Sequence, residues 1–267
     1  MKKKITAIFI SLGLVLCLAG HEFWIQPQRF HFKRGQPIRI RFQVGENFEG
    51  ENWSGNKASM RDIRLHFAEY TDDIKNLLSD STNGDSLTVQ FFDEGTVLAS
   101  CQTSNKFIQL EPEKFLEYLK EDGLEETIKL REEYNEKDSS GREFYQRNIK
   151  SLMQIGSVID STYKKTTELP LDIIPLSHPY LIKKKQHFQA KVLFEGDPLS
   201  NQLIKLWHRS KGKTEMLDLK TDEQGIVEME INPYGQWMLS TVKIVRLPDD
   251  TTASWQSYWG SFTWGYY

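Results

Sequence analysis

The sequence predicts a mainly β protein, built as two immunoglobulin-like β-sandwich parts with a helical insertion between them. Three observations support this prediction. Apolar and polar residues alternate in several short runs, turn residues punctuate those runs, and one central stretch follows a helical period instead. We expect an export signal over residues 1–20, an N-terminal β domain over 21–110, a helical insertion and connector over 111–168, and a C-terminal sandwich over 169–267.

Clear strand patterns begin the first part. In residues 37–44, Ile, Phe and Val alternate with Arg and Gln, which predicts a half-buried strand. Arg64 and His66 are expected to face outward from a second strand, and residues 45–59, rich in Gly, Asn and Glu, are predicted to form a loop. The other strands expected in this part cover residues 63–67, 87–92 and 96–100.

The central part changes to a helical period after residue 110. Pro112 suits a first helical turn, an apolar stripe follows it, and Gly123 suits a C-terminal cap. A second helix is expected over 124–137, whereas residues 142–155 fit either a helix or a strand. Because the rest of the helical surface is charged, we expect both helices to be peripheral to any ligand site.

Strand patterns return after residue 170. Residues 188–194 alternate, Gly196-Asp197-Pro198 makes a turn, and the segment from Asp222 to Gly225 is typical of a hairpin loop. Short strands separated in this way predict a sandwich. The expected strands cover residues 188–194, 203–207, 227–231 and 237–245.

The start of the chain has the composition of an export signal. Three lysines precede an apolar run from Ile5 to Ala19, which is too short for a comfortable membrane span and has no second run behind it. We therefore expect a periplasmic or otherwise exported protein with no transmembrane span after signal removal. Cleavage after Gly20 is favoured, cleavage after Ala19 is the alternative, and lipidation at Cys17 is a third option.

Charge and cysteine content exclude some classes of function. Removal of residues 1–20 takes away three lysines and moves the net charge from −3 to −6. A mildly acidic chain without a basic block is a poor partner for nucleic acid or an anionic membrane surface. Cys17 leaves with the signal, so Cys101 stands alone and is expected to be a small buried apolar residue.

His21 becomes the first residue if the signal is cut after Gly20. A terminal histidine offers a divalent transition metal two nitrogens, the free α-amine and the ring, in one chelate. Such a chelate needs a further ligand from the fold. The candidates are Glu22, His66 and His178; the remaining histidines are expected to be structural or exposed, namely His31, His187 and His208.

Four separated motifs occur in order along the chain: His21-Glu22-Phe23-Trp24-Ile25-Gln26-Pro27, Phe115-Leu116-Glu117-Tyr118-Leu119 with Asp122-Gly123-Leu124, Arg142-Glu143-Phe144-Tyr145-Gln146-Arg147, and Trp255-Gln256-Ser257-Tyr258-Trp259. Together they resemble a family of exported bacterial proteins of unknown function that is linked to periplasmic accessory components of nickel and cobalt uptake. The resemblance implies the periplasm, a β-rich fold, metal handling and a ligand role for His21. The family pattern has Asn where this chain has His178, which argues against His178 as a shared ligand.

The second half is similar to the transthyretin-like or carboxypeptidase-regulatory type of immunoglobulin sandwich. The residues that carry this likeness are Gly196-Asp197-Pro198-Leu199 and Thr221-Asp222-Glu223-Gln224-Gly225. It is a likeness of fold, and such folds do not fix a function.

Two further groups of residues have competing interpretations. The aromatic residues at the C-terminus suggest carbohydrate stacking, but packing into the core is favoured. One interpretation of the basic residues Arg142, Arg147 and Lys150 is a binding site for a carboxylate or phosphate group. The interpretation favoured here is a surface ion-pair network with Glu143. The aromatic residues in question are Trp255, Tyr258, Trp259, Phe262, Trp264, Tyr266 and Tyr267.

The common catalytic signatures are absent from the sequence, including the phosphate loop, His-Glu-x-x-His and Gly-x-Ser-x-Gly. We expect a non-enzymatic metal-binding or metal-delivery accessory protein for nickel, cobalt or copper, with a membrane transporter or another envelope protein as partner. A non-catalytic immunoglobulin-like module that binds a glycan or a protein is the alternative. A copper oxygenase of the terminal-histidine type is a minor alternative.

Overall fold

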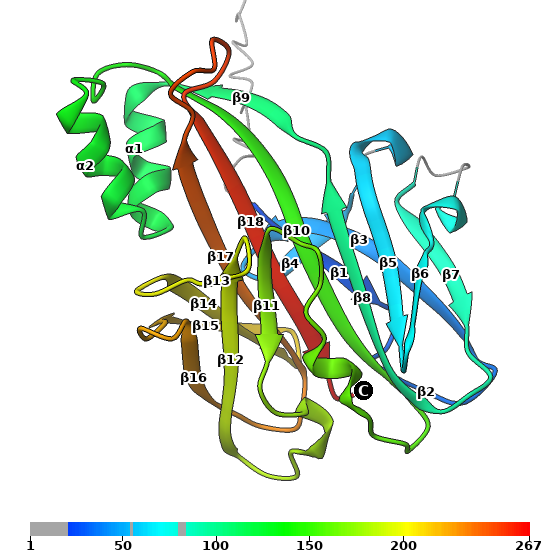
Figure 1. Ribbon diagram of the computed structural model, residues 1–267. Helices are drawn as coiled ribbons and strands as arrows, with labels where there is room; N and C mark the ends of the chain where they lie inside the picture. Colours follow the sequence, from blue (N-terminus) through cyan, green and yellow to red (C-terminus); the bar gives the residue numbers. More distant parts are fainter. Residues whose placement is uncertain (1–20, 54–55, 80–83) are drawn as a thin grey trace, which may run out of the picture.

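Three β-sheets and two α-helices make up the chain in the computed structural model, which describes residues 21–53, 56–79 and 84–267 (Figure 1). The predicted mainly β class with a helical insertion is confirmed. The predicted export signal, with Cys17, falls on residues 1–20 and lies outside the described residues. Within the described ranges, no helix is long and apolar enough to span a membrane.

The largest sheet has ten strands within these ranges. They are β2 (His31–Phe32), β5 (Met60–Phe67), β6 (Tyr70–Asp73), β8 (Gly95–Thr103), β9 (Lys106–Leu110), β10 (Gly141–Ile155), β14 (Leu203–Ser210), β15 (Lys213–Lys220), β17 (Gln236–Arg246) and β18 (Trp255–Gly265). Eight of them follow the order β15-β14-β17-β18-β10-β8-β5-β6, while β2 and β9 pair with β10. At the centre, β10 and β18 run in parallel, with Arg147 opposite Trp259.

Two smaller sheets cover opposite faces of the large one. The first contains β1 (Glu22–Pro27), β3 (Pro37–Glu46), β4 (Glu49–Asn52) and β7 (Ser86–Gln90); the second contains β11 (Leu171–Pro175), β12 (Gln186–Phe194), β13 (Asp197–Pro198) and β16 (Ile226–Ile231). Successive side chains of a strand point to opposite faces. Accordingly, Val97 and Ala99 of β8 pack under the first small sheet, and Leu98 between them packs under the second.

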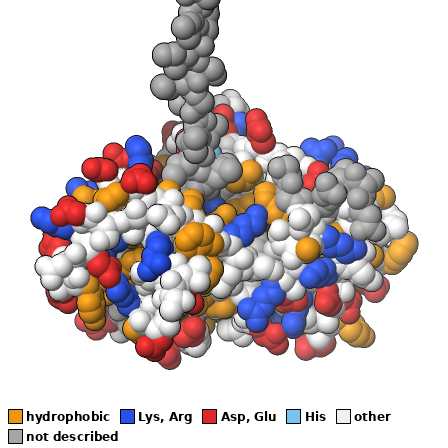
Figure 2. Space-filling model, turned by 90° about the horizontal axis from the view of Figure 1, so that it is seen from above, with side chains coloured by type: hydrophobic (Ala, Val, Ile, Leu, Met, Phe, Trp, Pro, Cys, Tyr) orange, Lys and Arg blue, Asp and Glu red, His pale blue; other side chains and the backbone are white. Residues whose placement is uncertain are grey.

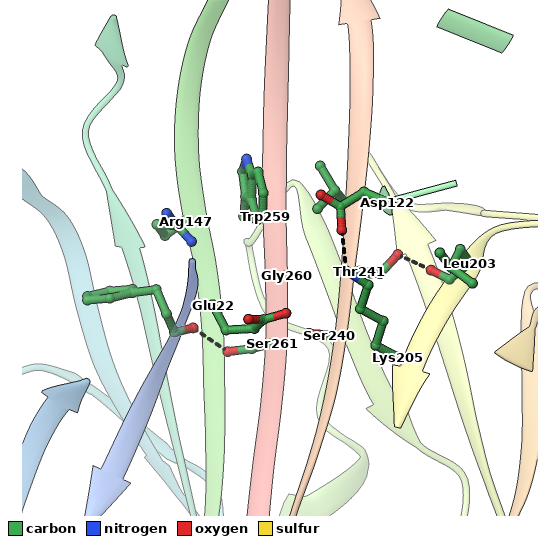
Figure 3. Close-up of a pocket in the computed structure, with 12 residues that line it drawn as sticks. Glu22, Asp122, Arg147, Leu203, Lys205, Ser240, Thr241, Trp259, Gly260 and Ser261 are labelled. Carbon is green, nitrogen blue, oxygen red and sulfur yellow. Dashed lines mark hydrogen bonds and ion pairs between the residues drawn. The ribbon is translucent and has the colours of Figure 1, made fainter. Parts of the chain in front are cut away.

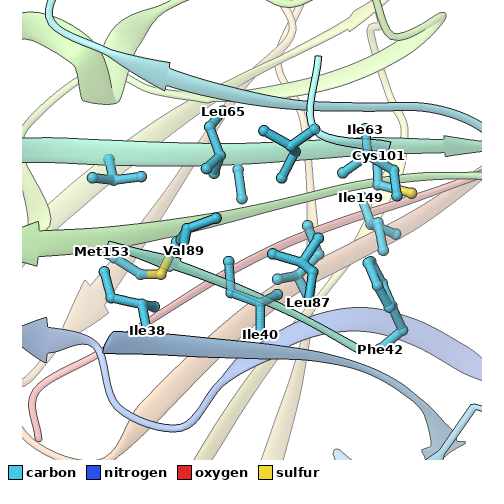
Figure 4. Packing of buried hydrophobic residues seen from close by; sticks show 14 of the residues in the cluster. Ile38, Ile40, Phe42, Ile63, Leu65, Leu87, Val89, Cys101, Ile149 and Met153 are labelled. Carbon is cyan, nitrogen blue, oxygen red and sulfur yellow. The ribbon is translucent and has the colours of Figure 1, made fainter. Parts of the chain in front are cut away.

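The core beneath the first small sheet is largely aliphatic (Figure 4). Ile38, Ile40 and Phe42 of β3 point into it and are buried, while the arginines between them are exposed, so the predicted alternation is confirmed. Cys101 lies in the same core, where burial raises the pKa of its thiol. It is a small buried apolar residue, as predicted.

The helical insertion contains α1 (Pro112–Glu121) and α2 (Glu125–Glu133). Gly123 follows α1 with a φ of +65°, the left-handed conformation that glycine adopts easily. Phe115 of α1 is fully buried in a cluster with Trp255 and Trp259 of β18. A Cβ on Gly141 would lie 2.2 Å from the ring of Phe115, so this close approach of helix and sheet requires a glycine there.

Some local predictions were wrong or incomplete. The expected loop at 45–59 contains the strand β4, which forms a hairpin with β3. Residues 142–155, which fitted either a helix or a strand, lie in β10, and the edge strand β15 was not expected. The side chain of His66 lies on the outward face of β5, as predicted. It is nevertheless buried, because the segment 161–169 lies over it.

The predicted domain boundaries cut through one continuous sheet. Residues 169–267 supply β14, β15, β17 and β18 to the ten-stranded sheet and all of the second small sheet. Residues 21–110 supply β5, β6 and β8 on the other side of β10. The division into two sandwich domains therefore stays a prediction.

Candidate functional site

His21 lies directly before β1, at the edge of the first small sheet. Because β1 pairs antiparallel with β3 and Glu22 stands opposite Gly45, the next pair outward is His21 and Glu46. Nε2 of His21 lies 2.8 Å from Oε1 of Glu46. Among the described residues, Nδ1 of His21 has no hydrogen-bond partner. Nε2 of His21 is therefore engaged by Glu46, and Nδ1 is available for a ligand.

A buried arginine fixes the backbone of His21. Nη1 of Arg147 donates a hydrogen bond to the carbonyl oxygen of His21. The guanidinium carbon lies 5.9, 5.6 and 4.8 Å from the ring centroids of Phe23, Tyr145 and Trp259, within the range of cation–π attraction. Burial lowers the pKa of Arg147, and the group still stays charged at neutral pH. The first described residue is thus tied to the core.

Glu22 turns its side chain into the protein, beside Arg147 and Lys205 (Figure 3). Burial raises the pKa of Glu22 to about 7, although the charge of Lys205 opposes the change. Nζ of Lys205 lies 2.7 Å from Oδ1 of Asp122. The enclosed space between these groups is about 10 Å³, enough for about one water molecule. This inner space is too small for an organic ligand.

A larger cleft of about 290 Å³ opens next to it. We call it the Glu46 cleft, and it is lined by Glu22, Glu46, Asn47, Leu110, Lys114, Glu117, Tyr118, Glu121, Lys205 and Trp207. Four carboxyl groups and two ammonium groups are among these described residues, an excess of negative charge that attracts cations. α1 supplies Glu117 and Glu121 to this cleft, whereas α2 supplies none of the residues that line it. The expectation that both helices are peripheral to any ligand site stays a prediction.

Charges elsewhere on the surface are mixed. Figure 2 shows Lys and Arg side chains interspersed with Asp and Glu on the face seen from above. The excess of carboxyl groups in the Glu46 cleft is therefore a local feature of its lining.

A second buried carboxyl group lies on the same face of β10 as Arg147. Ser257 Oγ donates a hydrogen bond to Oε1 of Glu143, and the hydroxyl of Tyr118 lies 3.5 Å from the same oxygen. Burial raises the pKa of Glu143 to about 7, although these hydrogen bonds oppose the rise. Its Oε2 has no hydrogen-bond partner in the described part of the chain, which favours the neutral form.

The predicted cluster of Arg142, Arg147 and Lys150 does not form. Arg147 and Lys150 are three positions apart on β10 and point to opposite faces of the sheet. Arg142 donates to the carbonyl of Thr251 at 3.1 Å, and Nζ of Lys150 pairs with Oδ1 of the buried Asp172 at 2.5 Å. The expected surface ion-pair network is wrong, because β10 runs through the centre of the sheet and both of its faces are covered.

His66 lies on β5, away from His21. Its Nδ1 is 3.0 Å from Oγ1 of Thr71, and its Nε2 is 3.0 Å from Oγ of Ser100. Burial lowers its pKa to about 4, and nearby cations, Lys165 first, lower it further. It lines a different cleft from Glu22 and Glu46.

His178 lies after β11 and is also buried. Its Nδ1 accepts the backbone N–H of Tyr180 at 3.2 Å, so the ring proton belongs on Nε2, which is 2.9 Å from Oγ1 of Thr96. Thr96 in turn donates to Gln154 at 3.1 Å. Burial lowers the pKa of His178 to about 4. The neutral ring has no lone pair left for a metal in this arrangement.

Of the predicted ligands, the structure places His21 against Glu46, whose cleft Glu22 also lines, and it leaves His66 and His178 apart. No group of three or more His, Cys, Asp or Glu side chains within residues 21–53, 56–79 and 84–267 is arranged to hold a metal ion. A metal at His21 would therefore need a free α-amine, which the predicted cleavage after Gly20 would expose.

A family model described as "Domain of unknown function (DUF4198)" matches residues 18–244. The chain belongs to this family. The predicted membership of a family of unknown function is thereby confirmed, while its link to nickel and cobalt stays a prediction. No curated protein matches the chain.

Three solved structures to which the chain is similar are distant likenesses. A marsupial T cell receptor matches 89% of this chain and 73% of its own at 9% identity, with a TM-score of 0.21. A mutant of Salmonella alpha-2-macroglobulin matches 92% of this chain and 15% of its own at 8% identity and a TM-score of 0.21. Three N-terminal domains of the bacteriophage RB49 Highly Immunogenic Outer Capsid protein match 92% and 71% at 7% identity and a TM-score of 0.21. TM-scores this low support no conclusion about fold or function, and the transthyretin-like prediction stays a prediction.

Sequence reasoning missed Glu46 and the role of Arg147. The pairing of β1 with β3 places Glu46 beside His21, but the sequence does not reveal this pairing. Nearly all residues of β1 are buried, so they show no alternation that would predict a strand there. Arg147 was noticed for its charge. Its aromatic surroundings come from three separate strands, so no local pattern reveals them.

Proposed function

We propose that this chain is an exported, periplasmic accessory protein that binds a nickel, cobalt or copper ion at its mature N-terminus. In this proposal it passes the metal to a membrane transporter or another envelope protein and catalyses no reaction itself. The observation that supports the proposal most is the contact between Nε2 of His21 and the carboxylate of Glu46.

That contact is the kind that supports a metal-binding histidine. Histidine ligands commonly donate their second ring N–H to a carboxylate, which fixes the tautomer and the ring orientation. With Nε2 of His21 directed at Glu46, the nitrogen left for a metal is Nδ1, the one that closes a chelate ring with the α-amine of the same residue. Arg147 holds the carbonyl of His21, so the chelating residue is positioned before the metal arrives.

The Glu46 cleft supplies the surroundings that a divalent cation favours. Its carboxyl groups outnumber its ammonium groups, and Glu22 and Glu46 both line it. Carboxylate oxygen joins imidazole and amine nitrogen in a donor set that suits divalent first-row metals, with copper bound more tightly than nickel and nickel more tightly than cobalt.

The test compares the mature protein beginning at His21 with a variant that carries one additional Ala before His21. The extension removes the chelate and keeps every side chain. We expect calorimetric titration with Cu(II) and Ni(II) to give tight binding to the mature protein and at least about a hundredfold weaker binding to the extended one. Equal affinities, or no binding to either protein, would refute the proposal.

Glu46→Gln tests the supporting contact. We expect a loss of metal affinity of about tenfold, the lower end of the range for such hydrogen bonds. The matched control is Glu228→Gln, because Oε1 of Glu228 lies 2.7 Å from Nδ1 of the internal, exposed His187 and this pair has no α-amine. An equal effect of the two substitutions would contradict a special role for Glu46.

The alternative of a glycan-binding module finds less support. Trp255, Trp259, Phe262 and Trp264 of β18 are all buried, so the favoured interpretation that the C-terminal aromatic residues belong to the core is confirmed for these four. Tyr258 and Tyr266 are partly buried against the core, and Tyr267 is exposed. A stacking surface for sugars needs exposed rings. The copper oxygenase alternative needs a second histidine beside His21, and the described histidines His66 and His178 are held elsewhere.

A further inference from the structure

A second cleft, about 580 Å³ in volume, opens between β5 and the segment 161–169. We call it the His66 cleft after the residue on its floor. His66 is held there by the hydroxyl groups of Thr71 and Ser100, each 3.0 Å from a ring nitrogen. A cleft of this volume lies within the range of small-molecule sites, about 300 to 1,000 Å³.

The walls of the His66 cleft carry more positive than negative charge. Three cations line it, Arg64, Lys164 and Lys165, against the two carboxylates of Asp62 and Glu168. Both carboxylates are already engaged, because Arg64 lies 2.8 Å from Asp62 and 3.0 Å from Glu168. The ammonium groups of Lys164 and Lys165 form no ion pair with the described residues, and the charged groups that line the cleft sum to a net charge of +1.

The remaining groups of this cleft suit a hydroxylated ligand. Ser161 and Thr166 line the cleft with hydroxyl groups, as do Thr71 and Ser100, whose hydroxyl groups also contact the ring of His66. Hydroxyl groups both donate and accept hydrogen bonds, whereas ammonium groups only donate. The combination therefore matches a molecule that has a negatively charged end and a hydroxylated body.

We propose that the His66 cleft binds a small organic anion whose carboxylate or phosphate group is held by Lys164 and Lys165 and whose hydroxyl groups contact the serine and threonine side chains of the cleft. This site uses none of the residues of the proposed metal site. The proposed anion site and the proposed metal site can therefore be tested independently.

His66 reports directly on the charge in the cleft. Its pKa is lowered to about 4, first by burial and then by Lys165, Lys150 and Arg64, with Asp172 acting in the opposite direction. A bound anion adds negative charge and stabilises the protonated ring. Occupation of the cleft should therefore raise the pKa of His66.

The experiment follows the ring proton resonances of His66 by NMR in the mature protein, during titration with citrate, with glycerol phosphate and with inorganic phosphate. Sodium chloride at matched ionic strength corrects for screening. We expect saturable shifts with at least one of these anions, together with a higher pKa of His66 at saturation. The comparison among the three anions tells a carboxylate ligand from a phosphate ligand.

The variant Lys164→Ala/Lys165→Ala tests the proposed contacts, and Lys184→Ala/Lys211→Ala removes the same charge elsewhere. We expect about tenfold weaker binding in the first variant and unchanged binding in the second. All four side chains project from the surface segments of the chain, so both proteins should fold. Absence of saturable shifts with all three anions, or an equal loss of affinity in the two variants, would overturn the proposal.

Discussion

Individual buried charged residues set the structure and the charge of the candidate site. Arg147 is enclosed by aromatic rings and ties its guanidinium to the carbonyl of His21, while Glu22 and Glu143 are buried close to it. Burial raises the pKa of both carboxyl groups to about 7, so the neighbourhood of His21 changes its charge near neutral pH. A carboxyl group buried without full hydrogen bonding favours its neutral form.

Glu143 should make stability depend on pH. Its pKa of about 7 in the folded protein exceeds the ordinary value of 4.5, so the stability it provides is complete below about pH 4.5 and is lost as the pH rises through 7. We predict that Glu143→Gln reduces the loss of unfolding free energy between pH 5 and pH 8 by about 3 kcal/mol. Urea unfolding at the two pH values measures this, with the exposed Glu113→Gln as control. The same loss in both variants would contradict the assignment.

At the scale of elements, the predictability of a strand depends on how its two faces are covered. β3 has one buried and one exposed face, so its alternation is plain in the sequence. β10 is buried on both faces over most of its length and contains Asn148, Lys150 and Gln154 there, so no alternation marks it. β15 is exposed on both faces along most of its length, so no alternation of apolar and polar residues marks it as a strand either.

The two helices should differ in their effect on metal binding. Glu117 and Glu121 of α1 line the Glu46 cleft, whereas Glu125 and Glu126 of α2 do not. We predict that Glu117→Gln/Glu121→Gln weakens metal binding about two- to fivefold at low salt, because exposed charges act weakly, and that Glu125→Gln/Glu126→Gln has no effect. Calorimetry at low and high salt measures both, and the effect of the first variant should fade with added salt. Equal behaviour of the two variants would contradict the role of α1.

At the scale of the whole molecule, the ten-stranded sheet joins segments that the sequence predicts as separate parts. The C-terminal part includes most of its own core, but Phe30, Leu98 and Leu152 from outside residues 169–267 also belong to that core. Such contacts between distant segments follow from the strand order, which no local pattern encodes. The fold class and most strands could be predicted from the sequence, whereas the shared sheet and the setting of His21 could not.

This arrangement predicts how the C-terminal part behaves alone. A fragment of residues 169–267 should fold with a β-type circular dichroism spectrum, since it contains a complete small sheet and four strands of the large one. Its free energy of unfolding should be lower than that of the mature chain, because β18 loses β10 and the core loses large apolar side chains. Disorder in the fragment would refute the domain division, and equal stability would show that β10 contributes nothing to this part.

The central claim is that the α-amine and Nδ1 of His21 bind the same metal ion. Electron paramagnetic resonance of Cu(II), added at one equivalent to the mature protein and to the variant with one additional Ala before His21, tests it most directly. The account predicts nitrogen hyperfine coupling from two nitrogen donors in the mature protein and a different spectrum in the extended variant. Identical copper spectra from the two proteins would contradict the claim.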